Sequence, residues 1–186
     1  MVKNNFGKGL LLAALILSLN SFAYAGWNLG LGLLSSRIAA STSGSGAASQ
    51  FSFDNAPVLD VGYTAPFSQV FSGGFGLNYV FPAGTAGSTS TVQFVSPYGQ
   101  LVLMLPQVLG LSPNFQWKSG LSFAIINPNS LTIDPRGFTQ LALGVPISSS
   151  LIFNLGAQLQ SFHWTVFGNP FVNDFRALFT GLTLSL

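Results

Sequence analysis

The stretch Gly26–Arg37, GWNLGLGLLSSR, alternates large apolar residues with small or polar ones. Successive side chains of a β-strand point to opposite faces. One face of this segment would carry Trp27, Leu29, Leu31 and Leu33, and the other Asn28, Gly30 and Gly32. A strand that crosses a membrane needs about 9–11 residues, and this segment is long enough. The pattern therefore predicts a membrane-spanning strand with one apolar face.

Seven further segments show the same alternation. They are Val58–Ala65, Gln69–Phe81, Thr91–Leu105, Phe115–Ile125, Gln140–Ile147, Leu151–Gln160 and Ala177–Leu186. The pattern is least regular in Thr91–Leu105, where Pro97 interrupts it and residues 101–105 are apolar on both faces. If this segment or the connection Pro106–Asn114 were divided differently, the strand count would be ten. No apolar run after residue 25 reaches the 18 residues of a spanning helix, which excludes a helical membrane protein.

The composition of the two faces indicates which one meets the solvent. Gly, Ser, Thr, Asn and Gln dominate one face, whereas a soluble β-sandwich would place large apolar residues in its core. Small uncharged residues suit the crowded interior of a narrow barrel, and the large apolar set would then face lipid. We therefore predict an all-β fold, an eight-stranded antiparallel up-and-down transmembrane β-barrel over residues 26–186.

The predicted connections alternate in length, as in outer-membrane barrels. Long connections are expected at Ile38–Pro57, Phe81–Ser90, Asn127–Gly137 and Ser161–Asn173, and tight ones at Pro66–Ser68 and Ser148–Ser150, with Pro106–Asn114 intermediate. The part Ala39–Gln50 of the first is small, polar and uncharged, and we expect it to be a mobile surface loop. With the N-terminus in the periplasm, the long connections would lie outside the cell.

Residues 1–25 have the three parts of a secretory signal peptide. Lys3 and Lys8 supply the positive region, and Leu10–Leu19 is an apolar run of ten residues. Ala23 and Ala25 then occupy the small-residue positions of a cleavage site. The sequence therefore predicts a cleaved leader over residues 1–25 and a barrel domain over residues 26–186.

The chain after residue 25 carries very few charges. Its four basic residues are balanced by four aspartates, and it has no glutamate. The net charge of +2 in the full chain comes from the two leader lysines, so there is no basic patch for nucleic acid. The chain has no cysteine, which excludes disulfides and thiolate metal sites. No metal or cofactor motif is present, and we expect none to bind.

The last eight residues, FTGLTLSL, are similar to the C-terminal signal that outer-membrane barrels present to their assembly machinery. Gly181, Leu184 and Leu186 match that pattern, while Phe179 stands where a polar residue is usual and the final residue is Leu rather than Phe. The whole chain after the leader resembles the small eight-stranded barrels of the OmpA-transmembrane, OmpX and OmpW types. The resemblance implies an outer-membrane location, contact with lipid and lipopolysaccharide, and insertion by the barrel-assembly machinery.

Asp60 and Lys118 are the two charges that the alternation places inside the barrel. Unpaired charges in a dry interior are costly, so we expect them to form an ion pair, either a structural plug or a gate. Trp27 and Trp117 would lie near the periplasmic ends of their strands and Trp164 near the outer rim, as in the aromatic girdles of such barrels.

Arg37, Arg136 and Arg176 are all expected near the outer rim. Guanidinium groups pair well with phosphate, so these arginines are candidates for contact with lipopolysaccharide. The alternative is ordinary solvation beside Asp54, Asp134 and Asp174.

His163 is the only histidine, and the segment His163-Trp164-Thr165 is similar in outline to the His-x-Ser motif of lipid A deacylase barrels. Thr165 replaces the serine, and no glutamate exists to orient the histidine, so Asp174 is the only nearby acid. We therefore expect a rim histidine and no catalytic residues.

Four functions remain open on the sequence. The first is a non-enzymatic structural or adhesive barrel that presents outer loops. The second is a narrow channel for small or apolar solutes, as in the OmpW type. The third is a lipid A-modifying enzyme, and the fourth is a secreted assembly subunit that never enters a membrane. The sequence favours the first, and it leaves the ligand and the oligomeric state open.

Overall fold

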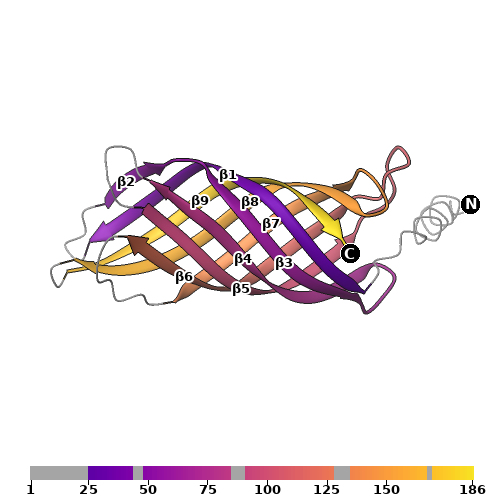
Figure 1. The fold of residues 1–186 in the computed structure, drawn as a ribbon, viewed down its shortest axis with the longest axis horizontal. Coiled ribbons are helices and arrows are strands. Elements are labelled where there is room, and N and C mark those ends of the chain that lie inside the picture. Colours follow the sequence, from indigo (N-terminus) through magenta and orange to yellow (C-terminus); the bar gives the residue numbers. More distant parts are fainter. Residues whose placement is uncertain (1–24, 44–47, 85–90, 128–134, 167–168) are drawn as a thin grey trace, which may run out of the picture.

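A computed structural model describes residues 25–43, 48–84, 91–127, 135–166 and 169–186, and these form nine β-strands. The strands are β1 (Gly26–Ser43), β2 (Ala48–Phe53), β3 (Ala56–Pro66), β4 (Phe71–Gly84), β5 (Thr91–Met104), β6 (Asn114–Asn127), β7 (Arg136–Pro146), β8 (Leu151–Val166) and β9 (Asn169–Ser185). All neighbouring strands are antiparallel, and β9 pairs with β1 to close the sheet into a barrel (Figure 1).

The barrel has eight strand positions, because β2 and β3 share one. Both pair with β1, β3 through Gly26–Leu34 and β2 through Arg37–Thr42, and only Asp54 and Asn55 separate them. The prediction of an eight-stranded antiparallel barrel is therefore confirmed. Within the described residues the stretch 91–114 adds no further strand position, because Leu105–Pro113 forms a turn with a single bridge, Val108↔Leu111.

The two ends of the barrel differ in their connections. At one end, here called the turn end, four-residue turns join β3 to β4 and β7 to β8, and Leu105–Pro113 joins β5 to β6. The C-terminus lies at this end too, where the Leu186 amide donates to the Trp27 carbonyl. The other end, here called the loop end, carries β2 and the tips of β8 and β9 (Figure 1).

Two of the four long connections predicted at the loop end, Ile38–Pro57 and Ser161–Asn173, are largely strand. In the segment Ile38–Pro57, β1 continues to Ser43 and β2 begins at Ala48, so most of the expected mobile loop is a paired hairpin. Likewise β8 continues to Val166 and β9 begins at Asn169, inside the segment Ser161–Asn173. Small polar residues are typical of loops, but they also pair in a ladder when the neighbouring strand presents its backbone groups.

A belt of exposed apolar side chains surrounds the barrel. It includes Leu29, Leu31, Leu33, Val61, Phe75, Leu77, Phe115, Leu121, Phe123, Leu141, Leu143, Leu155, Leu178 and Leu182. Such a contiguous apolar surface is unfavourable in water and typical of a barrel in lipid. Among the described residues no helix is both long enough and apolar enough to cross a membrane.

On three neighbouring strand positions near the loop end, the alternation of inward-pointing and outward-pointing residues is interrupted. The β1–β9 register shifts by one residue between Ser35 and Ile38, and the β4–β5 register shifts between Val80 and Ala83. On the strand position between them, Asp54 and Asn55 are both exposed. A single extra residue in a strand moves every following side chain to the opposite face. These irregularities turn Arg37, Phe53 and Ala83 toward the interior.

Candidate functional site

The barrel interior is the candidate site, and its turn end holds a cavity of about 390 Å³. Hydroxyl and amide side chains dominate its lining, including Asn28, Thr64, Gln100, Gln116 and Ser185. These groups largely bond to each other. The Asn28 amide donates to Thr64 Oγ1 at 2.9 Å, and Gln100 also donates to that hydroxyl. The lining is therefore polar, and its uncharged groups are largely paired by hydrogen bonds within the protein.

Asp60 on β3 and Lys118 on β6 meet at the inner part of this cavity. Their Nζ–Oδ2 distance is 2.8 Å, and both side chains are about nine-tenths buried. The Tyr98 hydroxyl donates to Asp60 Oδ1 at 2.6 Å, and Asn78 donates to Oδ2 at 3.1 Å. Lys118 also lies 4.7 Å from the centre of the Tyr98 ring. The structure thus brings together the two charges that the alternation predicts inside, and both carboxylate oxygens of Asp60 accept hydrogen bonds.

Two facing glycines make room for Tyr98. Gly62 and Gly76 are paired across β3 and β4, and a side chain at either would collide with the Tyr98 hydroxyl. At Gly76 an added Cβ would also lie 2.5 Å from the Val61 carbonyl oxygen. The missing side chains let Tyr98 reach across the interior to Asp60. Sequence reasoning did not select Tyr98, although two glycines on the inner face of adjacent strands are a readable sign of a large side chain opposite.

A central polar cluster follows the ion pair along the interior. Its members are at most 2 % exposed: Asn78, Ser96, Ser122, Gln140, Gln158 and Gln160. Gln160 donates to both serines, and Gln140 donates to Gln158 at 3.2 Å. None of the six side chains lines the cavity. The cluster therefore lies beyond the lining of the cavity.

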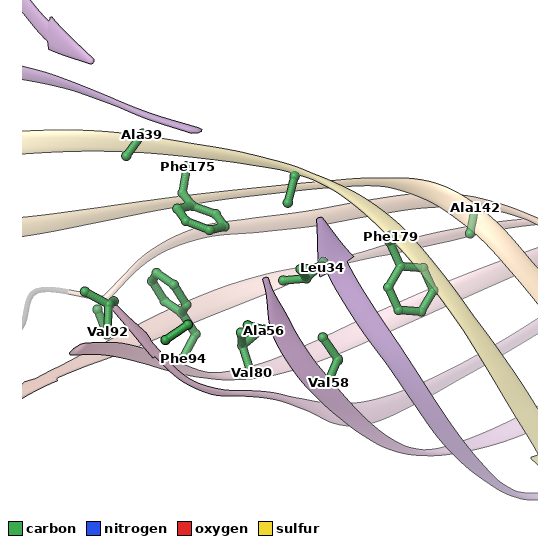
Figure 2. Packing of buried hydrophobic residues seen from close by; sticks show 13 residues of the cluster. Leu34, Ala39, Ala56, Val58, Val80, Val92, Phe94, Ala142, Phe175 and Phe179 are labelled. Atoms are coloured by element: carbon green, nitrogen blue, oxygen red, sulfur yellow. The ribbon is translucent and has the colours of Figure 1, made fainter. Parts of the chain in front are cut away.

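The loop half of the interior is apolar, which corrects the prediction of a uniformly small and polar inner face. An apolar cluster lies largely in this half, and its member Ala142 is nearer the turn end, where it pairs with Gln116 of the cavity lining. The cluster comprises Leu34, Ala39, Ala56, Val58, Val80, Ala83, Val92, Phe94, Ala124, Ala142, Phe175, Ala177 and Phe179. Figure 2 shows the Phe94 and Phe175 rings facing each other, with centroids 5.4 Å apart. The expectation of a side-chain-filled lumen holds, but large apolar residues do much of the filling.

Arg37 lies inside this apolar half and not on the outer rim where we expected it. The side chain is 1 % exposed, so in this position it cannot touch lipopolysaccharide. Its guanidinium carbon lies 4.7 Å from the Phe175 ring centre and 5.6 Å from that of Phe53. Its Nη1 donates to the Asp54 carbonyl oxygen at 2.6 Å. The physical reason is the bulge after Ser35, which moves Arg37 to the inner face.

The other two arginines lie near the loop end, as expected. Arg176 is exposed on β9, and Arg136, at the start of β7, is partly buried. Asp174 is also exposed and accepts from the Ser161 hydroxyl at 2.8 Å. Contact of Arg136 or Arg176 with lipopolysaccharide stays a prediction.

The tryptophans occupy different heights. Trp27 is 54 % exposed at the turn end and meets Tyr63 edge-on, with ring centroids 5.7 Å apart. Trp117 is 47 % exposed, three residues from the start of β6. The backbone of Trp164 pairs with Phe171 in the β8–β9 extension, at the loop end, and its side chain lies outside the described residues. The same holds for the His163 side chain.

The C-terminal segment closes the barrel. Gly181 pairs with Gly32, and Leu184 pairs with Leu29, so β9 holds the first strand. Leu184 and Leu186 are exposed on the outer face. Recognition of these three residues by assembly machinery stays a prediction. The predicted leader lies almost wholly outside the described residues, and β1 begins at Gly26, directly after the predicted cleavage site.

Among the described residues no group of three or more His, Cys, Asp or Glu side chains could hold a metal ion. No family model matches the sequence, and no curated protein matches it. Solved structures do match. Neisserial surface protein A is 10 % identical, with a TM-score of 0.55 over 87 % of this chain and 98 % of that one. OprG from Pseudomonas aeruginosa is 11 % identical, with a TM-score of 0.49 over 89 % and 98 %. AlkL is 14 % identical, with a TM-score of 0.49 over 89 % and 92 %.

The closed eight-position barrel, its apolar belt and the similarity to Neisserial surface protein A define the class of the fold. The chain is a small transmembrane β-barrel of the kind found in bacterial outer membranes.

Proposed function

We propose that this protein is a non-enzymatic outer-membrane barrel with a closed interior, which acts through its outer surface and loop end. The observation that carries the proposal is that buried side chains from facing strands meet across the interior beyond the turn-end cavity. The polar cavity at the turn end is followed by the ion pair Asp60–Lys118, then by the central polar cluster, then by the apolar cluster. Eight strands leave little lumen, and here side chains occupy it.

The orientation follows from the connections. Outer-membrane barrels carry tight turns on the periplasmic side, and the four-residue turns β3–β4 and β7–β8 lie at the turn end, so the polar cavity would open toward the periplasm. The Asp60–Lys118 pair is then a plug at the floor of a blind cavity. Its partners, Tyr98 and Asn78, support a structural role, because they bond both carboxylate oxygens.

Planar-bilayer recordings of the refolded protein test this proposal. We expect no current steps above the lipid background, for the wild type and for the outward-facing control variant L141A. Stable unitary conductance that changes in D60N would show that the pair is a gate and would overturn the closed-barrel proposal.

The second candidate is a narrow channel for apolar or amphipathic solutes. The observation in its favour is the apolar loop half, which would suit such a solute better than a hydrated ion. Efflux of dodecanoate from liposomes, compared with efflux of glucose, separates the two functions. Faster efflux of dodecanoate from liposomes that contain the protein than from protein-free liposomes would support the channel.

A further inference from the structure

The turn-end cavity has two facing walls whose polar groups bond differently. The wall of β1, β3 and β9 bonds to itself, because the Asn28 amide donates to Thr64 Oγ1 and the Ser185 hydroxyl donates to Asn28 Oδ1 at 3.1 Å. The other wall belongs to β5 and β6, on the far side of the closed sheet from β9 and β1. Gln100 and Gln116 line the cavity there. A ligand that competes with as few internal bonds as possible would therefore bind the β5–β6 wall.

The β5–β6 wall holds two hydrogen-bond acceptors that no described residue uses. Both glutamines donate through Nε2, Gln100 to Thr64 and Gln116 to Asn114 and Asn154. Oε1 of each glutamine has no hydrogen-bond partner among the described residues, yet neither atom is fully enclosed. Both side chains are partly exposed, and both line the cavity. The unused oxygens therefore face space that a ligand can occupy.

Lys118 adds donors to the same wall. It is paired with Gln100 across β5 and β6, and it lines the cavity. Its ammonium has three N–H donors, and Asp60 Oδ2 is its one oxygen partner among the described residues. Because Asp60 neutralises Lys118, the pair carries no net charge. The wall thus presents donors and acceptors side by side without a net charge.

The chemistry of the lining indicates the class of ligand. A hydroxyl group can donate to an amide oxygen and accept from an ammonium at the same time, so a compound with several hydroxyls matches this wall. A charged ligand would lose its hydration and find no opposite net charge. Val102, Met104, Pro146 and Ile152 give the cavity apolar surface, against which C–H groups can pack. The cavity volume of about 390 Å³ lies within the range of about 300–1,000 Å³ that is usual for small-ligand sites.

We propose that the turn-end cavity binds an uncharged polyhydroxyl compound of about the size of a monosaccharide. Gln100 Oε1 and Gln116 Oε1 accept hydrogen bonds from its hydroxyls, and Lys118 donates to them. In a closed barrel the compound enters and leaves at the turn end. The site does not rest on the closed-barrel proposal, because binding needs only the cavity, so conductance tests closure and sugar binding tests the site.

Saturation-transfer NMR with glucose, on the protein in phosphatidylcholine nanodiscs, tests the site. We expect saturable binding to the wild type. Q100M keeps the length of the side chain but removes the amide, and it should weaken glucose binding about fivefold, because a hydrogen bond to the ligand is lost. Thr64 keeps its bond from Asn28 in this variant. The matched control is Q93M, the same substitution on the same strand but outside the cavity lining, which should leave the affinity unchanged.

Two charged analogues of glucose test the class of the ligand. Glucosamine carries a positive charge and glucuronate a negative one, while both keep the ring and most of the hydroxyls. Each should bind about tenfold more weakly than glucose, because its charge is desolvated beside a neutral pair.

Three outcomes would overturn the proposal. They are the absence of saturable glucose binding beyond that of empty nanodiscs, equal affinity in Q100M and the wild type, and equal affinity for either charged analogue. If Q100M does not give a heat-modifiable folded band, V102F decides the matter. Val102 lines the cavity and its side chain has no polar atom, so phenylalanine narrows the cavity without removing a hydrogen bond. Unchanged glucose affinity in V102F would contradict the assignment.

Discussion

The two halves of the barrel interior are occupied by side chains of different chemistry. In the turn half, polar side chains meet around a cavity, and the buried charges Asp60 and Lys118 neutralise each other. In the loop half, aliphatic and aromatic side chains pack together, and the buried Arg37 has Asp54 as a nearby negative charge without a direct ion pair. The turn half is thus held by specific polar pairs, and the loop half by apolar packing.

The polar groups of the two halves differ in how completely they bond. Groups in the turn half largely bond to each other around the cavity. In the loop half, Arg37 Nε and Nη2 have no hydrogen-bond partner and are enclosed by the surrounding side chains. The comparison also explains why the prediction of a small, polar inner face describes the turn half well and the loop half poorly.

The largest expected effect is the loss of one partner of the ion pair. K118M leaves the Asp60 carboxylate buried without its counter-ion, and we expect a loss of about 3–5 kcal/mol in unfolding free energy. Urea unfolding of the refolded barrel measures it. In the double variant D60N/K118M the uncompensated charge is gone, so its stability should lie closer to that of the wild type. A double variant less stable than K118M would show that the pair is not the unit that holds the turn half.

The next effect is the loss of a ring from the loop half. F175A removes a fully buried ring that packs against Phe94 and Arg37, and we expect a cost of about 3–4 kcal/mol from the cavity it leaves. F175L keeps most of the volume and should cost under about 1.5 kcal/mol. If the halves are independent, the costs of F175A and K118M add to within about 0.5 kcal/mol in the same urea titration. A larger coupling would mean that the two halves form one cooperative unit.

A smaller effect is expected from filling the space that Tyr98 crosses. G76A places a methyl group against the Tyr98 hydroxyl and the Val61 carbonyl, and such overpacking costs about 1–3 kcal/mol. G137A is the control, because no atom lies within 4 Å of an added Cβ there. The midpoint temperature of the heat-modifiable band should fall for G76A and stay near the wild-type value for G137A. Equal midpoints would show that Tyr98 has room to move.

The smallest effect concerns the central polar cluster between the halves. Q158L removes the acceptor of the Gln140 amide and should cost about 1 kcal/mol or somewhat more, since a buried donor is left unpaired. Q140L/Q158L removes both partners and should be close to neutral in urea unfolding. A double variant that is much less stable than Q158L would show that the cluster is needed for more than filling.

Much of the architecture could be predicted from the sequence because alternation is a local property. Each strand needs only its own residues to define an apolar and a polar face, and Gly26–Leu34, Val58–Ala65 and Leu151–Gln160 carry that signal without interruption. The same alternation predicted that the Asp60 and Lys118 side chains point into the barrel. Their contact required only that two unpaired charges in one narrow interior attract each other.

The height of a residue along the barrel axis could not be predicted in this way. The same holds for the bulges that turn outward-pointing residues inward. The sequence predicts Arg37 at the outer rim because the strand Gly26–Arg37 is expected to end there, whereas pairing with β2 and β9 extends β1 to Ser43. The bulge after Ser35 then turns the side chain inward. A bulge depends on how two neighbouring strands match in register, and a single sequence segment does not contain that information.

The sequence by itself thus determined the fold class and the apolar outer surface, because these depend on periodicity and composition, and it favoured eight strand positions over ten. Only the tertiary structure decided which part of the interior is polar and which is apolar, and that Tyr98 reaches Asp60 across two glycines. It also decided that Arg37 is buried between Phe53 and Phe175. These features depend on strand register and on contacts between residues far apart in the chain, which closure of the barrel brings together.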